Sequence, residues 1–202
     1  ARNRDLQLIK KFYLRKNSAI SSNSNYSSSM AKDVYGIKTG VLWPCVDATE
    51  FPEVDTNDVE NPYSGNDEYV VNIGKASWVK GTWETIKMIS GTNLGLVHVG
   101  GGEQKDLKKL KEYADYLDVN LWIAPRLSSP ELVSLMRNSR AIVSMAYGEA
   151  FGLTPIEAFA VGTPAIFVNE GGFRDTIKDG VSGKLLDRDD LTAWHVALQE
   201  AS

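Results

Sequence analysis

From residue 68 onward, short apolar segments alternate with longer segments of helical periodicity. Each apolar segment is continuous and rich in β-branched residues, which is typical of strands buried on both faces. The predicted strands are 68–74, 94–100, 119–124, 141–146 and 164–168, the last of which leads into 173–180. The predicted helices are 80–90, 103–117, 128–138, 154–162 and one that begins near Asp189. This alternation predicts an α/β fold, with a Rossmann-like parallel sheet and helices on both of its faces.

The first 67 residues follow a different pattern. A Ser-rich segment is predicted to form a strand at 18–22 and a helix at 28–35, and a second strand is predicted within 40–47. Pro, Asn, Asp and Gly then dominate 49–68, which predicts a loop. This part is too short to be a second complete α/β domain.

Charge and apolar content argue against a nucleic-acid-binding protein and against a membrane-spanning one. The net charge is −4, so bulk electrostatics give no reason to bind nucleic acid, because proteins that track phosphates carry clustered Lys and Arg. The basic run at 10–16 is interpreted as the solvated face of a helix, with a membrane-surface patch as the alternative. Cys45 is the only cysteine, which excludes an internal disulfide, and we expect it to be buried. No apolar run approaches about 18 residues, so we expect no transmembrane segment and a cytoplasmic protein, with a peripheral membrane location as the alternative.

The segment GEAFGLTPIEAFAVGTP, at 148–164, carries the most specific chemistry. Its helix is predicted to start with Thr154 as the cap and Pro155 in the first turn, and Glu157 then closes a capping box. A carboxylate has two oxygens, so Glu157 can cap with one and accept a ligand hydroxyl with the other. Glu149 lies in a loop at the carboxyl edge of the sheet, where ligands bind, or it is simply a solvated loop acid. A helix start suits phosphates and the acids suit sugar hydroxyls, which together indicate a nucleotide sugar.

A second cluster, GKASWVKG at 74–81, places Lys75 and Lys80 around a turn after a strand. Such a pair can neutralise a diphosphate without a metal, although two solvated lysines are the simpler interpretation. Other polar residues are interpreted structurally. His98 lies within an apolar strand and is expected in the core, and in Asp187-Arg188-Asp189 we expect Asp189 or Asp190 to cap the last helix rather than to bind a metal.

Together these segments resemble the C-terminal half of family 4 retaining glycosyltransferases, which have the two-domain GT-B fold. The resemblance covers most of the chain from about residue 36, and its most specific part is the block 148–186 with two acids spaced as E-x7-E. It implies a donor-binding site without a metal or cofactor. The residues it implies are Gly74, Lys75, Lys80, Glu149, Phe151, Gly152, Leu153, Thr154 and Glu157.

The resemblance also implies a role for each group. Glu149 would contact hydroxyls of the donor sugar and Glu157 the nucleotide ribose, while the backbone of 151–153 faces the sugar and phosphates. Lys75 and Lys80 would stabilise the diphosphate. Lys75 stands where the family has arginine, so a single point charge replaces a two-pronged donor.

The resemblance implies that 36–202 is the nucleotide-sugar-binding domain, and that 1–35 is the tail of an N-terminal acceptor domain or a crossing segment. The predicted function is retaining transfer of a hexose from a UDP- or GDP-sugar in glycan biosynthesis. The acceptor is an unidentified glycan, lipid or small molecule, and the acceptor half would come from a longer chain or a partner chain. A non-catalytic nucleotide-sugar-binding module is the alternative. A sugar-nucleotide epimerase would need acid–base residues in the cleft, for which His98 and His195 are poorly placed.

Overall fold

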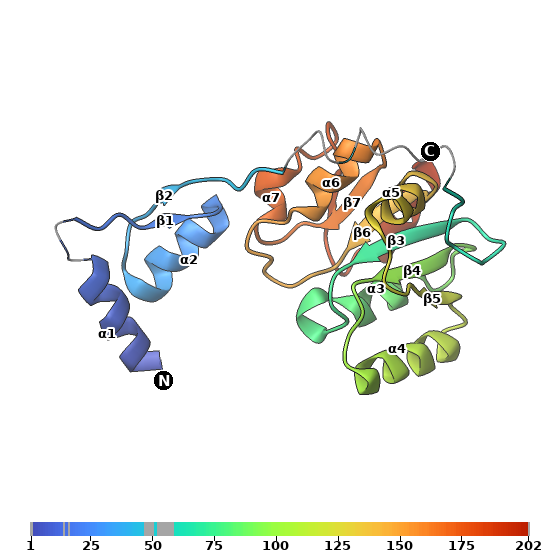
Figure 1. Cartoon of the computed structure of the whole chain (residues 1–202), viewed down its shortest axis with the longest axis horizontal. Helices are drawn as coiled ribbons and strands as arrows, with labels where there is room; N and C mark the ends of the chain where they lie inside the picture. The colour runs from blue at the N-terminus through green and yellow to red at the C-terminus, as the bar shows by residue number, and fades with distance from the viewer. Residues whose placement is uncertain (1, 14, 16, 47–50, 52–58, 202) are drawn as a thin grey trace.

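A parallel sheet of six strands forms the main body of the protein (Figure 1), with the strand order β5-β4-β3-β6-β7-β8. The computed structural model describes residues 2–13, 15, 17–46, 51 and 59–201. The strands are β1 (Ser21–Ser22), β2 (Gly40–Val41), β3 (Tyr69–Ile73), β4 (Gly95–Val99), β5 (Leu121–Ile123), β6 (Ala141–Ser144), β7 (Ala165–Val168) and β8 (Lys184–Leu186). The helices are α1 (Arg2–Tyr13), α2 (Asn25–Tyr35), the 3-10 helix η1 (Trp78–Lys80), α3 (Thr82–Ile89), α4 (Gln104–Tyr116), α5 (Ser129–Arg137), α6 (Thr154–Val161), α7 (Phe173–Thr176) and α8 (Leu191–Glu200).

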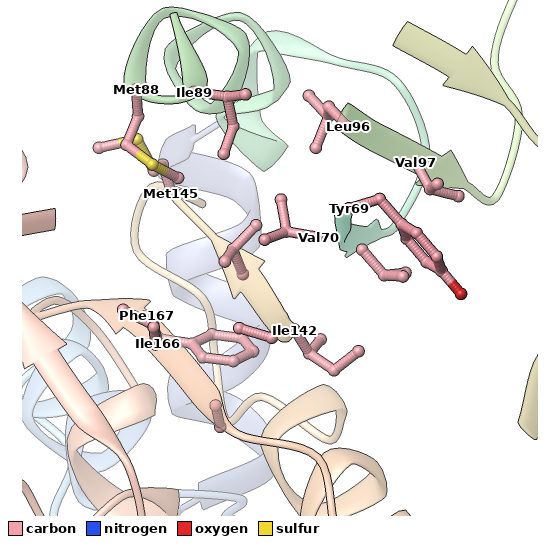
Figure 2. Close-up of a cluster of buried hydrophobic side chains, with 14 of the residues drawn as sticks. Tyr69, Val70, Met88, Ile89, Leu96, Val97, Ile142, Met145, Ile166 and Phe167 are labelled. Atoms are coloured by element: carbon pink, nitrogen blue, oxygen red, sulfur yellow. The ribbon is translucent and has the colours of Figure 1, made fainter. Parts of the chain in front are cut away.

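The core lies on both sides of the four inner strands, whose apolar side chains are buried whichever face they point to. Every residue of β6 and β7 is buried, and in β3 and β4 only the last residue is partly exposed. Figure 2 shows Val70, Ile142 and Phe167 from three neighbouring strands within one apolar cluster. Burial on both faces requires a helical layer on each side of the sheet.

The helices form two such groups. Helix α3 contacts α4 and α8, whereas α5 contacts α6, and α6 contacts α7. The predicted α/β fold with a parallel sheet is therefore confirmed. Strand β8 is missing from the prediction because it is a three-residue edge strand with only two apolar residues, too short to produce a pattern.

Near the N-terminus the two strands are shorter than predicted, and the helix between them is longer. Strands β1 and β2 form a two-residue parallel pair. Helix α2 begins three residues before the predicted start, because Ser24 caps it by accepting a hydrogen bond from the Ser27 N–H. In Figure 1 these elements lie on the side of α7, apart from the six-stranded sheet. Of the predicted loop at 49–68, residues 49, 50 and 52–58 lie outside the described residues.

The exposure of the basic run on α1 agrees with its prediction, whereas the exposure of Cys45 does not. Lys10 and Lys11 are exposed on α1, as expected for a solvated face, and Phe12 and Tyr13 are exposed beside them. Cys45 was expected to be buried, and this was wrong: it is exposed in the segment after β2, outside the apolar core. Among the described residues no helix has the length and apolar character needed to cross a membrane.

Candidate functional site

A cavity of about 310 Å³ opens at the carboxyl edge of the sheet, near the ends of β3 and β6. These neighbouring strands are the point where the chain changes direction, since β4 lies on one side of β3 and β7 on the far side of β6. Open α/β sheets bind ligands at such a switch point. The cavity brings together six of the nine predicted site residues: Lys80, Glu149, Phe151, Gly152, Leu153 and Thr154.

The start of α6 faces this cavity with unused backbone donors. Leu153 is the N-cap and no side chain caps the helix. The N–H groups of Gly152, Leu153 and Thr154 donate to no atom of the described residues. Gly152 has φ +87°, and a Cβ there would lie 2.6 Å from the Phe173 ring, so glycine is needed to hold this turn. An uncapped helix N-terminus carries partial positive charge and suits an anion.

The capping box predicted at Thr154 and Glu157 was wrong. The N-cap is Leu153, one residue before the predicted cap, so Thr154 is already helical and the Glu157 N–H donates to the Leu153 carbonyl at 3.0 Å. A capping box does exist at α5, where Ser128 and Glu131 bond reciprocally. The Glu157 carboxylate therefore has no capping role.

Glu157 is half-buried without a protein partner. Its carboxylate makes no hydrogen bond or ion pair with the described residues, and burial raises the pKa of Glu157. Buried polar groups usually have a partner. Glu157 does not line the cavity, but it lies three residues after Thr154, and residues so spaced share one face of a helix. Its carboxylate is available to a ligand that extends past the helix start.

Lys80 and Glu149 pair with each other across the cavity. Lys80 Nζ lies 2.5 Å from Glu149 Oε2, and the two side chains are 40% and 22% exposed. The second carboxylate oxygen, Oε1, accepts from the Ala150 N–H at 3.1 Å. The cation predicted to hold a diphosphate is thus neutralised by the acid predicted to hold the sugar.

The other two predicted residues lie at the margin. Gly74 does not line the cavity, although its missing side chain would lie 3.7 Å from Lys80. Lys75 is exposed, lies off the cavity and makes no ion pair among the described residues. The assignment of Lys75 to the diphosphate therefore stays a prediction.

The sequence interpretation missed the apolar floor and one wall of the cavity. The additional lining residues are Asn23, Pro44, Ile73, Ser144, Ala150, Phe167 and Phe173. The Phe167 and Phe173 rings meet edge to face at 4.9 Å, and from sequence both are indistinguishable from core residues. Asn23 and Pro44 precede the sheet in sequence, so no local pattern connects them to it.

Two polar residues outside the cavity, His98 and Asp190, contact protein groups. His98 is fully buried, as expected, with Nδ1 3.2 Å from Asn72 Oδ1 and Nε2 3.2 Å from the Gly101 carbonyl. Burial lowers the pKa of His98, and the Gly101 contact opposes this only in part. Asp190 caps α8, as expected, by accepting from the Ala193 N–H. In the described part of the chain no three His, Cys, Asp or Glu side chains are grouped to hold a metal.

A larger depression of about 500 Å³ lies at the opposite, amino-terminal edge of the sheet. Its polar groups already bond to one another: Tyr63 donates to Asp67 at 2.6 Å, and Asn120 donates to the same carboxylate at 3.0 Å. Burial and the Asp67 contact raise the pKa of the Tyr63 hydroxyl far above its usual value. This network stabilises the turn before β3.

Comparison with known proteins identifies a family for the part of the chain that forms the six-stranded sheet. The family described as "Glycosyl transferases group 1" matches residues 53–202. D-inositol 3-phosphate glycosyltransferases from Paenarthrobacter aurescens and Corynebacterium kroppenstedtii are 34% and 35% identical over 102 and 112 residues. These alignments cover 50% and 52% of this chain but only 25% of each relative.

Solved structures show the same fold over nearly the whole chain. Sucrose-phosphate synthase from Thermosynechococcus elongatus matches 98% of this chain with a TM-score of 0.81 and 21% identity. Anabaena HepE, solved in complex with UDP and glucose, also matches 98%, with a TM-score of 0.80 and 18% identity. The chain spans 52% and 57% of these two proteins. Its sheet and helices therefore correspond to half of a GT-B structure.

Proposed function

The chain belongs to the group 1 glycosyl transferases, the family 4 enzymes it resembles, and we propose that its cavity binds a nucleoside diphosphate sugar as the donor for retaining sugar transfer. One observation carries the proposal. A single cavity at the sheet switch point combines an uncapped helix start, a lysine and a carboxylate. Phosphate oxygens only accept hydrogen bonds, whereas sugar hydroxyls also donate, so these groups match the two parts of such a donor.

In this proposal the diphosphate lies at the start of α6. The N–H groups of 152–154 and the ammonium of Lys80 donate to its oxygens, and Lys75 approaches from the margin. Glu149 accepts from hydroxyls of the sugar. Glu157, which has no protein partner, accepts from the ribose. The base is not assigned, so UDP- and GDP-sugars remain the candidates.

The chemistry that follows is charge stabilisation. As the bond between the anomeric carbon and the diphosphate oxygen breaks, its electron pair goes to the leaving diphosphate, where Lys80 and the helix start meet the growing charge. The sugar becomes oxocarbenium-like, and contacts through Glu149 hold it in position. By analogy with the family, an acceptor hydroxyl attacks from the leaving-group side. Its proton passes to the departing diphosphate, so no protein nucleophile is required.

The acceptor half is proposed to lie outside 36–202, with 1–35 belonging to it or crossing to it. A second candidate is a non-catalytic donor-binding module, which would use the same cavity residues. Turnover separates the two functions. The enzyme proposal expects a chain extended by its N-terminal domain to release nucleoside diphosphate from the donor, whereas a module binds the donor without consuming it.

Thermal unfolding with a panel of UDP-, GDP- and ADP-sugars tests donor binding directly. A ligand at 100 times its Kd adds about 2.7 kcal/mol to the free energy of unfolding, a shift of several degrees. Calorimetry on two variants then tests the site. Lys80→Ala and Glu157→Ala should each weaken binding of the sugar nucleotide that stabilises the protein.

Matched controls come from α4, where Lys105→Ala and Glu112→Ala remove the same charges far from the cavity. Because Glu157 has no capping role, Glu157→Ala should not lower the melting temperature, so a loss of affinity cannot be attributed to a damaged helix. The proposal fails when no sugar nucleotide binds, or when both site variants bind as tightly as the controls.

A further inference from the structure

One wall of the cavity comes from a segment that precedes the sheet by many residues. Asn23 follows β1 directly and Pro44 lies three residues after β2, and both line the cavity with Lys80 and Glu149. Strands β1 and β2 run parallel, so the residues that follow them emerge at the same end of the pair. Figure 1 shows this pair and α2 on the side of α7, outside the six-stranded sheet.

Hydrogen bonds fix this segment onto the loop that carries Glu149. Ser24 is fully buried, and its hydroxyl donates to the Ala150 carbonyl while accepting from the Ser27 N–H at 2.8 Å. The Ser27 hydroxyl donates to the same carbonyl at 3.2 Å. On the other side of the helix start, the Asn25 N–H donates to Asp175 at 2.9 Å. The position of Asn23 relative to the loop is therefore set by bonds on its immediate neighbour.

This hydrogen bond places Asn23 and Glu149 next to each other at the cavity. Each directly precedes one partner of the hydrogen bond between Ser24 and Ala150, so their backbones are neighbours although they are far apart in sequence. Both side chains line the same cavity. A group held by Glu149 is then within reach of a group held by Asn23.

The Asn23 amide is partly buried and makes no hydrogen bond with the described residues. A carboxamide donates and accepts, whereas Lys80 only donates and the Glu149 carboxylate only accepts. The diphosphate presents acceptors alone, and the start of α6 and Lys80 already supply donors for it. A sugar hydroxyl, which both donates and accepts, is the part of the donor that matches a carboxamide.

We propose that Asn23 hydrogen-bonds a hydroxyl of the donor's sugar, so that the segment from β1 to Pro44 completes the donor site. This inference rests on the proposed function. It adds a sugar-specific contact from a part of the chain that lies before the sheet, and it predicts a contribution to discrimination between sugars rather than to diphosphate binding.

The test compares each sugar nucleotide with the nucleotide that lacks the sugar. The probes are UDP-glucose and UDP-N-acetylglucosamine against UDP, GDP-mannose against GDP, and ADP-glucose against ADP, measured by calorimetry on the wild-type chain and Asn23→Ala. The loss of one neutral hydrogen bond should weaken the bound sugar nucleotide by about 2- to 13-fold and leave its sugar-free nucleotide unchanged. Asn93→Ala, which removes an exposed loop amide outside the cavity, should change neither affinity.

The outcomes separate the two proposals. When nucleotides bind but the ratio of the two affinities is the same in Asn23→Ala and wild type, the inference fails and the proposed function stands. Equal losses for the sugar nucleotide and the nucleotide assign Asn23 a structural role and also overturn it. When no probe binds the wild-type chain, the proposed function fails and this inference fails with it.

Discussion

The ion pair between Lys80 and Glu149 leads to an unusual expectation for Glu149→Gln. With no ligand, the lysine is held by the carboxylate at 2.5 Å. A diphosphate must compete with that carboxylate for the lysine and must also approach its negative charge. Glutamine keeps the size of the side chain and removes the charge. We therefore expect Glu149→Gln to bind UDP more tightly than wild type, although the substitution alters a site residue.

The magnitude follows from the exposure of the pair. Side chains that are 40% and 22% exposed are screened by water, so the full interaction of two unit charges at this distance does not apply. Partly exposed pairs are worth roughly 0.2–1 kcal/mol. Releasing Lys80 from such a pair corresponds to about 1.4- to 5-fold tighter binding of UDP. The gain should shrink at high salt, because salt screens the same interaction.

Calorimetry with UDP and UDP-glucose on both proteins measures the effect. For UDP-glucose the gain should be smaller or reversed, because a neutral amide replaces the charged acceptor of the sugar hydroxyls. Glu103→Gln is the matched control, since it breaks an ion pair with Lys105 of 3.0 Å outside the cavity. Weaker UDP binding by Glu149→Gln, or an equal gain in Glu103→Gln, would refute the reasoning.

Two further predictions concern stability. In denaturant titrations, Gly152→Ala should lower the free energy of unfolding more than Gly162→Ala does. Both glycines have positive φ, which costs an alanine about 1–2 kcal/mol, but only at Gly152 would the new Cβ also meet the Phe173 ring. Equal losses in the two variants would show that the ring moves aside without cost. Since burial lowers the pKa of His98, the unfolded chain takes up this proton first, so stability should be full above about pH 6.5 and fall below it by up to about 1.4 kcal/mol per pH unit. His98→Gln should flatten this slope, and a slope unchanged by that substitution would contradict the reasoning.

The sheet could be predicted because its inner strands carry their own signal. β3, β4, β6 and β7 are runs of apolar, mostly β-branched residues, and burial on both faces requires that composition. The N-cap of α6 was predicted one residue too late, because Thr-Pro is a strong local signal for a helix start, whereas leucine is rarely an N-cap. That single residue changed Glu157 from a capping group into an unpartnered carboxylate.

The N-terminal wall of the cavity could not be predicted in the same way. Asn23 lies in a Ser-rich segment without periodicity, and its neighbour Ser24 bonds to Ala150, 126 residues later. Contacts of that range leave no trace in local patterns. Cys45 was misplaced for a related reason: a lone cysteine is most often buried, but this one lies in the segment after β2, away from the apolar core.

The strand order also determines when the cavity can form. Asn72 on β3 donates to the carbonyl of Val143 on β6, 71 residues later, so the two strands beneath the cavity meet only after a long loop closes. Closure of such a loop costs about 4 kcal/mol in chain entropy, before any contact compensates for it. The units β3-α3-β4 and β6-α6-β7 have short connections and can form earlier. Secondary structure should thus return first when the unfolded chain refolds, and the capacity to bind a ligand only when its two halves join.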